Sequence, residues 1–187
     1  MKKALNLGCG PSYLKSDEVE WINTDLVTDH NFHPDQLWDF LEPIPLPDGS
    51  VDFILAWHIL EHAALHQRDG MIKDWYRVLK PGGRLAIAVP DILTLFGMYQ
   101  RNEFSNDPPP WYTLMVNIYG PFNGSIGDTH KWGYNFGELD GVLRKNGFEN
   151  VLRLNHGNIP DEIREFVMSD PPLVTFADWA AQALCQK

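Results

Sequence analysis

Short apolar segments and one amphipathic stretch alternate along the first half of the chain. Residues 4–7, 20–26 and 51–57 have the apolar patterns of strands, and the near-continuous apolar run of the third is typical of a parallel strand covered on both faces. Apolar positions between residues 65 and 79 recur at helical spacing, and residues 84–89 form a further apolar run. This succession of strand, helix and strand predicts a parallel α/β sheet with right-handed crossovers.

The pattern is less regular in the rest of the chain. Residues 37–40 are a candidate short strand in a polar, proline-rich stretch, and residues 138–146 and 150–155 read as a helix and a strand. Within residues 173–184, a strand in the first half is preferred over an alanine-rich helix. Residues 91–135 follow no period and are rich in glycine, proline and aromatic residues. This segment is expected to be a lid or binding segment, or else a set of aromatic side chains that cover a sheet edge.

The turn after the first strand carries a candidate binding site. Gly8 and Gly10 are one residue apart, and glycine lets the backbone approach a ligand closely. A dinucleotide fingerprint would need a third glycine where Tyr13 stands, and Pro11 removes one of the amides that would bind phosphate. The turn therefore favours a ligand without phosphate, such as S-adenosylmethionine.

A carboxylate follows at the end of the second predicted strand. Asp25 stands seventeen residues after Gly8, near the separation of about 20 residues at which a doubly wound sheet presents an acid to a ribose. The alternative is a solvated acid at a strand end. The spacing favours a ribose ligand.

Composition narrows the class of protein. A chain of 187 residues is most simply one domain with a sizeable core. The formal net charge of -10 and the pI of about 5.0 disfavour a nucleic-acid partner. Two cysteines do not form a disulfide framework and fit a reducing compartment. Because the first residues run directly into a strand and no apolar run reaches the ~18 residues that span a bilayer, we expect a cytoplasmic protein with no signal peptide and no membrane span.

Several motifs occur together in a recognisable order. They are L-N-L-G-C-G-P, W-I-N-T-D-L, P-L-P-D-G-S-V-D-F-I, H-I-L-E-H and W-Y-R-V-L-K-P-G-G-R-L. In this order the chain resembles the class I S-adenosylmethionine-dependent methyltransferases, and in particular small bacterial ones associated with cell-envelope sugar genes. The resemblance covers about residues 4–90, and it continues more weakly at residues 130–134 and 145–148.

The resemblance implies a fold and a domain organisation. The fold is a Rossmann-like, doubly wound α/β fold with a mostly parallel seven-stranded sheet in the order 3-2-1-4-5-7-6, whose last strand is antiparallel, and with helices on both faces. Residues 1–187 would form a single domain. Residues 91–135 would be an inserted lid segment that contributes the acceptor site.

The resemblance also implies donor-binding residues. Gly8 and Gly10 would lie against the methionine and ribose portions of the donor, and Asp25 would accept both ribose hydroxyls. Asp39 would accept from the adenine amino group beside the Phe40 amide. The full expected donor site is Leu7, Gly8, Cys9, Gly10, Asp25, Leu26, Asp39, Phe40, Ala56, Trp57 and His58.

The remaining donor positions come from the end of the strand at residues 51–57. The Ala56 carbonyl would lie near the methionine amine, with Trp57 and His58 bordering the methyl group. Many relatives carry an acid at the position of Asn6 and a glycine at that of Ser12. Asn6 can still order the turn, and Ser12 can cap the turn that follows.

The implied reaction is transfer of a methyl group from S-adenosylmethionine to a small-molecule or glycan acceptor, with S-adenosylhomocysteine as product. An O-methylation needs a base, and His130 is the expected one. Tyr134 would assist it or contact the acceptor. The alternative for His130 is a histidine that orders its own loop through hydrogen bonds.

Two other functions compete with this reading. His58-Ile59-Leu60-Glu61-His62 satisfies H-x-x-E-H, a zinc-peptidase pattern, but it directly follows a buried strand instead of lying within a long amphipathic helix. The methyltransferase reading expects no metal ligands. The chain could also be a non-catalytic module that binds S-adenosylmethionine, because the donor site is better specified than the acceptor site.

Overall fold

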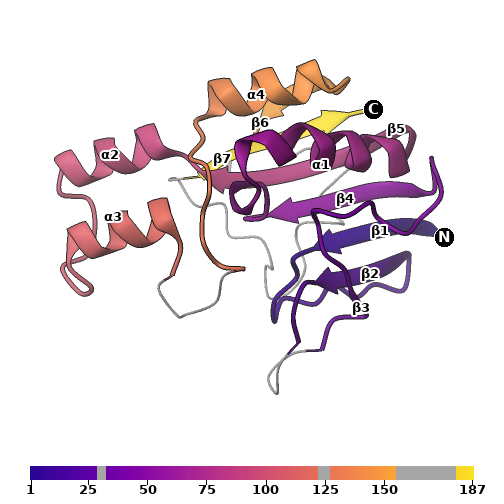
Figure 1. Cartoon of the computed structure of the whole chain (residues 1–187), viewed down its shortest axis with the longest axis horizontal. Coiled ribbons are helices and arrows are strands. Elements are labelled where there is room, and N and C mark those ends of the chain that lie inside the picture. The colour runs from indigo at the N-terminus through magenta and orange to yellow at the C-terminus, as the bar shows by residue number, and fades with distance from the viewer. Residues whose placement is uncertain (29–32, 122–126, 155–179) are drawn as a thin grey trace.

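A seven-stranded sheet forms the centre of the protein (Figure 1). The structure is a computed structural model that describes residues 1–28, 33–121, 127–154 and 180–187. The strands follow the order β3-β2-β1-β4-β5-β7-β6. Their bounds are β1 Lys2–Leu7, β2 Val19–Asp25, β3 Gln36–Leu37, β4 Val51–Trp57, β5 Leu79–Pro90, β6 Glu149–Arg153 and β7 Ala180–Gln186.

The strands of the first half are parallel to one another. β1 pairs with β2 on one side and with β4 on the other, and β2 pairs with β3, while β5 continues the parallel set beyond β4. β7 is antiparallel to both β5 and β6. The expected order and the antiparallel last strand are thus confirmed.

The larger part of the core lies on one face of the sheet, under two helices. Helix α1 (Leu65–Val78) buries Ile72 and Trp75, and helix α4 (Phe136–Lys145) buries Leu139 and Leu143. These side chains join one cluster with inward-facing residues of β1, β4, β5 and β7. A smaller cluster on the other face includes Phe53, Leu55 and Leu14. None of the helices in the described ranges has both the length and the apolar character to cross a lipid bilayer.

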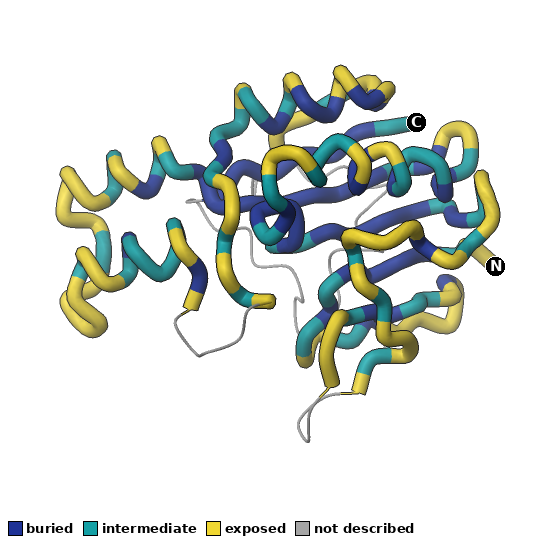
Figure 2. Tube along the Cα trace, viewed as in Figure 1, coloured by how far each residue is buried: buried dark blue, intermediate teal, exposed yellow. Residues whose placement is uncertain are grey.

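Two further helices lie beyond the carboxyl ends of the parallel strands. Helix α2 (Ile92–Gln100) and helix α3 (Pro110–Tyr119) occupy the aromatic-rich segment for which the sequence shows no period. Each buries one side chain, Leu95 and Leu114, and Figure 2 shows how exposed the pair is compared with α1. The side chain of Asp91 begins α2 by accepting the backbone amides of Leu93 and Thr94.

The remaining elements differ modestly from their expected limits. The short strand expected at residues 37–40 is only Gln36–Leu37. The preferred strand in the first half of residues 173–184 lies outside the described residues, whereas Ala180–Gln186 is a strand and not an alanine-rich helix. This segment is buried through Cys185 and pairs on both sides, so sheet pairing outweighs the helix propensity of its alanines.

Two buried asparagines fix the turn that follows β1. The side-chain amide of Asn6 donates to the Ser12 carbonyl at 2.8 Å and to Asn23 Oδ1 at 3.0 Å. Asn23 also accepts the Leu14 amide at 2.8 Å and donates to the Leu14 carbonyl at 3.1 Å. The side chain of Asn6 therefore orders the loop as expected, with Asn23 as its partner.

Replacing Asn23 is expected to destabilise the protein. Asn23→Ala leaves the amide and the carbonyl of buried Leu14 without these partners, so we expect the free energy of unfolding to fall by about 2–4 kcal/mol. Urea denaturation measures this loss. Gln100→Ala, at an exposed position, is the control and should change it little. A stability of Asn23→Ala equal to that of the control would contradict this role.

Candidate functional site

A pocket of about 250 Å³ lies where the first four strands end. It is lined by seven of the residues expected to bind the donor: Gly8, Gly10, Asp25, Leu26, Asp39, Phe40 and His58. These residues follow or end β1, β2, β3 and β4, whose carboxyl ends meet at the same edge of the sheet. The pocket adjoins the point between β1 and β4 where the strand order reverses, which is the usual ligand-binding position in an open α/β sheet.

The glycine turn forms one wall of this pocket. Gly8 has a φ of 62°, and a Cβ there would lie 2.5 Å from Cδ1 of Ile59. Gly10 also has a positive φ, of 49°. The turn therefore requires glycine at position 8 both for its backbone conformation and for space.

Asp25 links the turn to the second strand. Its Oδ2 accepts the Gly10 amide at 2.9 Å, and its Oδ1 accepts the Val27 amide at 3.2 Å. These bonds hold the carboxylate at the pocket, where it retains further lone pairs for a ligand.

Asp39 and Phe40 lie close to Asp25 because the backbone joins them. The Trp38 amide donates to the Asp25 carbonyl at 2.9 Å, which extends the pairing of β3 by one residue. Asp39 Oδ1 accepts the Leu41 amide at 2.9 Å, and this bond fixes the side chain where it lines the pocket. Two carboxylates and the glycine turn therefore converge on one cavity.

The other four expected donor residues do not line this pocket. Leu7 and Ala56 are buried in the core. Cys9 and Trp57 line a second, smaller pocket beside the core cluster on the opposite face. Burial raises the pKa of the Cys9 thiol to about 12, so the thiol is protonated and unreactive near neutral pH.

The end of β4 and the loop before α4 form the far side of the pocket. Strand β4 is followed by His58, at a φ of 56°, and then by the short 3₁₀ helix η1 (Leu60–His62). The amides of Lys131 and Trp132 donate to the Glu61 carbonyl at 2.7 and 3.3 Å. These two bonds bring a loop that is distant in sequence onto η1.

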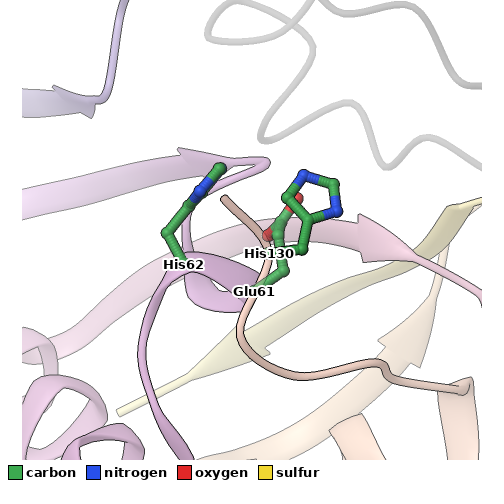
Figure 3. A group of neighbouring side chains, drawn as sticks. All are labelled: Glu61, His62 and His130. Atoms are coloured by element: carbon green, nitrogen blue, oxygen red, sulfur yellow. The ribbon is translucent and has the colours of Figure 1, made fainter. Parts of the chain in front are cut away.

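His130 lies in a cluster and not alone. Its ring packs edge-to-face on the ring of His62, with centroids 4.9 Å apart, and Figure 3 shows both rings beside Glu61. Its Nδ1 lies 3.0 Å from the Asn117 carbonyl. His130 therefore also hydrogen-bonds to the backbone, as expected for a histidine that orders its own loop. Burial lowers the pKa of His130, and the nearby Glu61 carboxylate partly offsets this effect.

Tyr134 occupies a different environment. It is fully buried in the main core cluster, its backbone carbonyl accepts the Ile92 amide at 2.8 Å, and it does not line the pocket. Burial raises the pKa of its phenol well above the ordinary value. His130 does not line the pocket either, but its ring contacts His62, which does, so the structure separates the two residues that the sequence grouped as catalytic.

Sequence reasoning missed His62 and Lys131, which also line the pocket. Both lie within segments that carry the family resemblance, His62 in H-I-L-E-H and Lys131 in residues 130–134, but neither was assigned a role in the donor or acceptor site. In the structure the H-I-L-E-H motif begins directly after β4 and ends in a three-residue 3₁₀ helix, and it does not lie in the long helix that a peptidase of this kind would use.

Comparison with known proteins finds sequence matches over part of the chain and structural matches over nearly all of it. Residues 23–87 match the family described as a methyltransferase domain. A probable S-adenosylmethionine-dependent methyltransferase of Mycolicibacterium smegmatis is 35% identical over 54 residues. That match covers 29% of this chain and only 20% of the length of the relative.

Solved structures extend the likeness to the whole chain. A SAM-dependent methyltransferase from Archaeoglobus fulgidus has a TM-score of 0.63 at 17% identity, covering 100% of this chain and 86% of its own. One from Aquifex aeolicus has a TM-score of 0.55 at 16% identity, covering 99% and 81%. The chain thus has the fold of class I S-adenosylmethionine-dependent methyltransferases, and the expected resemblance, enzyme class and cofactor agree with these relatives.

The position of Asp25 leads to a first prediction for the donor. Asp25→Ala should weaken S-adenosylmethionine binding by about 2 kcal/mol or more, roughly 30-fold, because the charged hydrogen bonds expected between Asp25 and the ribose would be lost. Titration calorimetry measures the affinity. Asp17→Ala, an exposed acid outside the pocket, serves as the control. An Asp25→Ala affinity equal to that of the control would remove Asp25 from the donor site.

Proposed function

We propose that the protein transfers the methyl group of S-adenosylmethionine to a hydroxyl of a small-molecule or glycan acceptor. The observation that carries this proposal is the convergence of Gly8, Gly10, Asp25 and Asp39 on one pocket at the strand-order reversal. Such a pocket offers carboxylates and close backbone, but few amides for phosphate. These groups suit an adenosine that carries a sulfonium and an amino acid.

The donor is proposed to lie along the glycine turn. Asp25 accepts hydrogen bonds from the ribose hydroxyls, and Asp39 and Phe40 contact the adenine. The methionine portion then extends past Gly8 toward the end of β4. In this orientation the methyl group points toward His58 and His62, which line the pocket near the end of β4.

The acceptor is proposed to bind between η1 and the loop that carries Lys131. The reaction is an in-line displacement in which an acceptor oxygen forms a bond to the methyl carbon. The carbon–sulfur bond breaks, its electron pair stays on sulfur, and the sulfonium becomes the thioether of S-adenosylhomocysteine. Because the sulfonium is already activated, most of the rate enhancement comes from holding the oxygen at attack distance, an effect that can supply about 7–11 kcal/mol.

His130 is proposed to take the proton of the acceptor hydroxyl. Its Nδ1 faces the Asn117 carbonyl, which can only accept, so Nδ1 carries the hydrogen and Nε2 keeps its lone pair. The His130 ring packs against the ring of His62, which lines the pocket, so His130 lies next to the proposed acceptor site. We assign this role to His130 and not to Tyr134, because Tyr134 is fully buried.

The proposed function is tested with labelled S-adenosylmethionine and a panel of sugars and small alcohols. Transfer of label to one of them, with S-adenosylhomocysteine released, supports the proposal. Micromolar donor binding with no transfer to any acceptor would instead favour a binding module without catalysis.

Substitution of His130 separates acceptor chemistry from donor binding. His130→Ala should lower turnover about 100-fold or more, since general base catalysis contributes 10²–10⁴-fold. Donor affinity by calorimetry should stay within a few-fold of the parent, because His130 lies outside the expected donor site. His66→Ala, an exposed histidine on α1, is the matched control. Equal turnover in His130→Ala and His66→Ala would exclude His130 as the base.

A further inference from the structure

The carboxylate of Glu61 is buried and only half satisfied. The residue is 1% exposed, and Oε1 faces Nδ1 of His58 at 3.1 Å. Oε2 is buried too and has no hydrogen-bond partner in the parts of the chain that the structure describes. A buried carboxylate oxygen without a partner costs free energy, so its retention calls for a specific ligand.

Two imidazoles next to Glu61 are held in the same tautomer. Nδ1 of His62 lies 3.3 Å from the Thr129 carbonyl, and Nδ1 of His130 lies 3.0 Å from the Asn117 carbonyl. Since a carbonyl can only accept, both Nδ1 atoms carry hydrogen and both Nε2 atoms keep a lone pair. Metal-ligating histidines are fixed in this way, by a backbone carbonyl on the nitrogen that does not bind the ion.

These three side chains come from two segments that are far apart in the sequence, η1 and the loop that carries His130. Ligand atoms of Glu61, His62 and His130 all lie within 4.8 Å of one another (Figure 3). Ligand atoms around a tetrahedral Zn²⁺ are about 3.3 Å apart at bond lengths of about 2.0 Å, so small side-chain rotations would close the site.

We infer that Glu61, His62 and His130 bind one divalent transition-metal ion of the Zn²⁺ class. Two imidazole nitrogens and one carboxylate oxygen form the ligand set of catalytic zinc sites that keep a fourth position open. Mg²⁺ and Ca²⁺ fit less well, because they prefer oxygen ligands throughout. His58 is not one of the ligands in this arrangement. Its contact with Oε1 of Glu61 orients the carboxylate and leaves Oε2 for the ion.

The ion would also bear on the acceptor, and this part of the inference rests on the proposed function. His62 lines the pocket, so the open position of the ion is reached from the acceptor side. An acceptor hydroxyl that binds the ion becomes more acidic through direct coordination. The Nε2 atom of His130 cannot ligate the ion and accept a proton at once, so the base role belongs to the ion-free protein.

Metal binding is tested on untagged protein that has been dialysed against a chelator. Co²⁺ absorption bands and Zn²⁺ calorimetry should both give one ion per chain, with micromolar or tighter affinity. Loss of a group that only orients a metal ligand typically weakens metal binding 10–100-fold. Glu61→Gln and His62→Asn change a direct ligand, so each should weaken ion binding at least tenfold. His66→Ala should bind the ion like the parent.

Urea denaturation of the same samples shows that each variant is folded, and donor affinity of the parent keeps the two proposals distinguishable. Parent protein that binds donor but no ion at millimolar Co²⁺ or Zn²⁺ would overturn the metal site and leave the proposed function intact. Equal ion affinity in the parent, Glu61→Gln and His62→Asn would overturn it as well. Ion binding with this mutational pattern but no methyl transfer would support the site while refuting the proposed function.

Discussion

The hydrogen bond from the Gly10 amide to the Asp25 carboxylate is the interaction on which the site depends. It joins the turn after β1 to the end of β2, so that two strand ends act as one wall. The left-handed backbone of Gly8 and Gly10 lets the turn come close to Asp25. The buried side chains of Asn6 and Asn23 hydrogen-bond to each other and stabilise the loop. The donor pocket is therefore built largely from backbone geometry, and side chains supply the charge.

Most of the sheet could be predicted because its strands carry their signal locally. The apolar run of β4 and the stripe of α1 are readable within a few residues, and the glycine turn marks the end of β1. The K-P-G-G-R-L part of the family motifs lies at the opposite end of the sheet from the pocket, in the first half of β5 after α1 ends. It identifies the fold without taking part in the site.

The hydrophobic periodicity of the sequence does not predict α2, α3, β7 or the pairing of His62 with His130, because tertiary contacts determine them. Helices α2 and α3 bury one side chain each and leave residues such as Phe96 and Trp111 exposed, so no polar face marks them as helices. Ala180–Gln186 has the composition of a helix and becomes a strand by pairing with β5 and β6. The grouping of His62 with His130 depends on the two bonds from the later loop to the Glu61 carbonyl, and no local pattern encodes these.

The central claim is that one adenosine binds between the glycine turn and the carboxylates of Asp25 and Asp39. A crystal structure with S-adenosylhomocysteine tests it most directly. The account predicts both ribose hydroxyls within hydrogen-bond distance of Asp25, the adenine beside Asp39 and Phe40, and the sulfur directed toward His58. A nucleoside bound elsewhere, with both carboxylates facing only solvent, would contradict it.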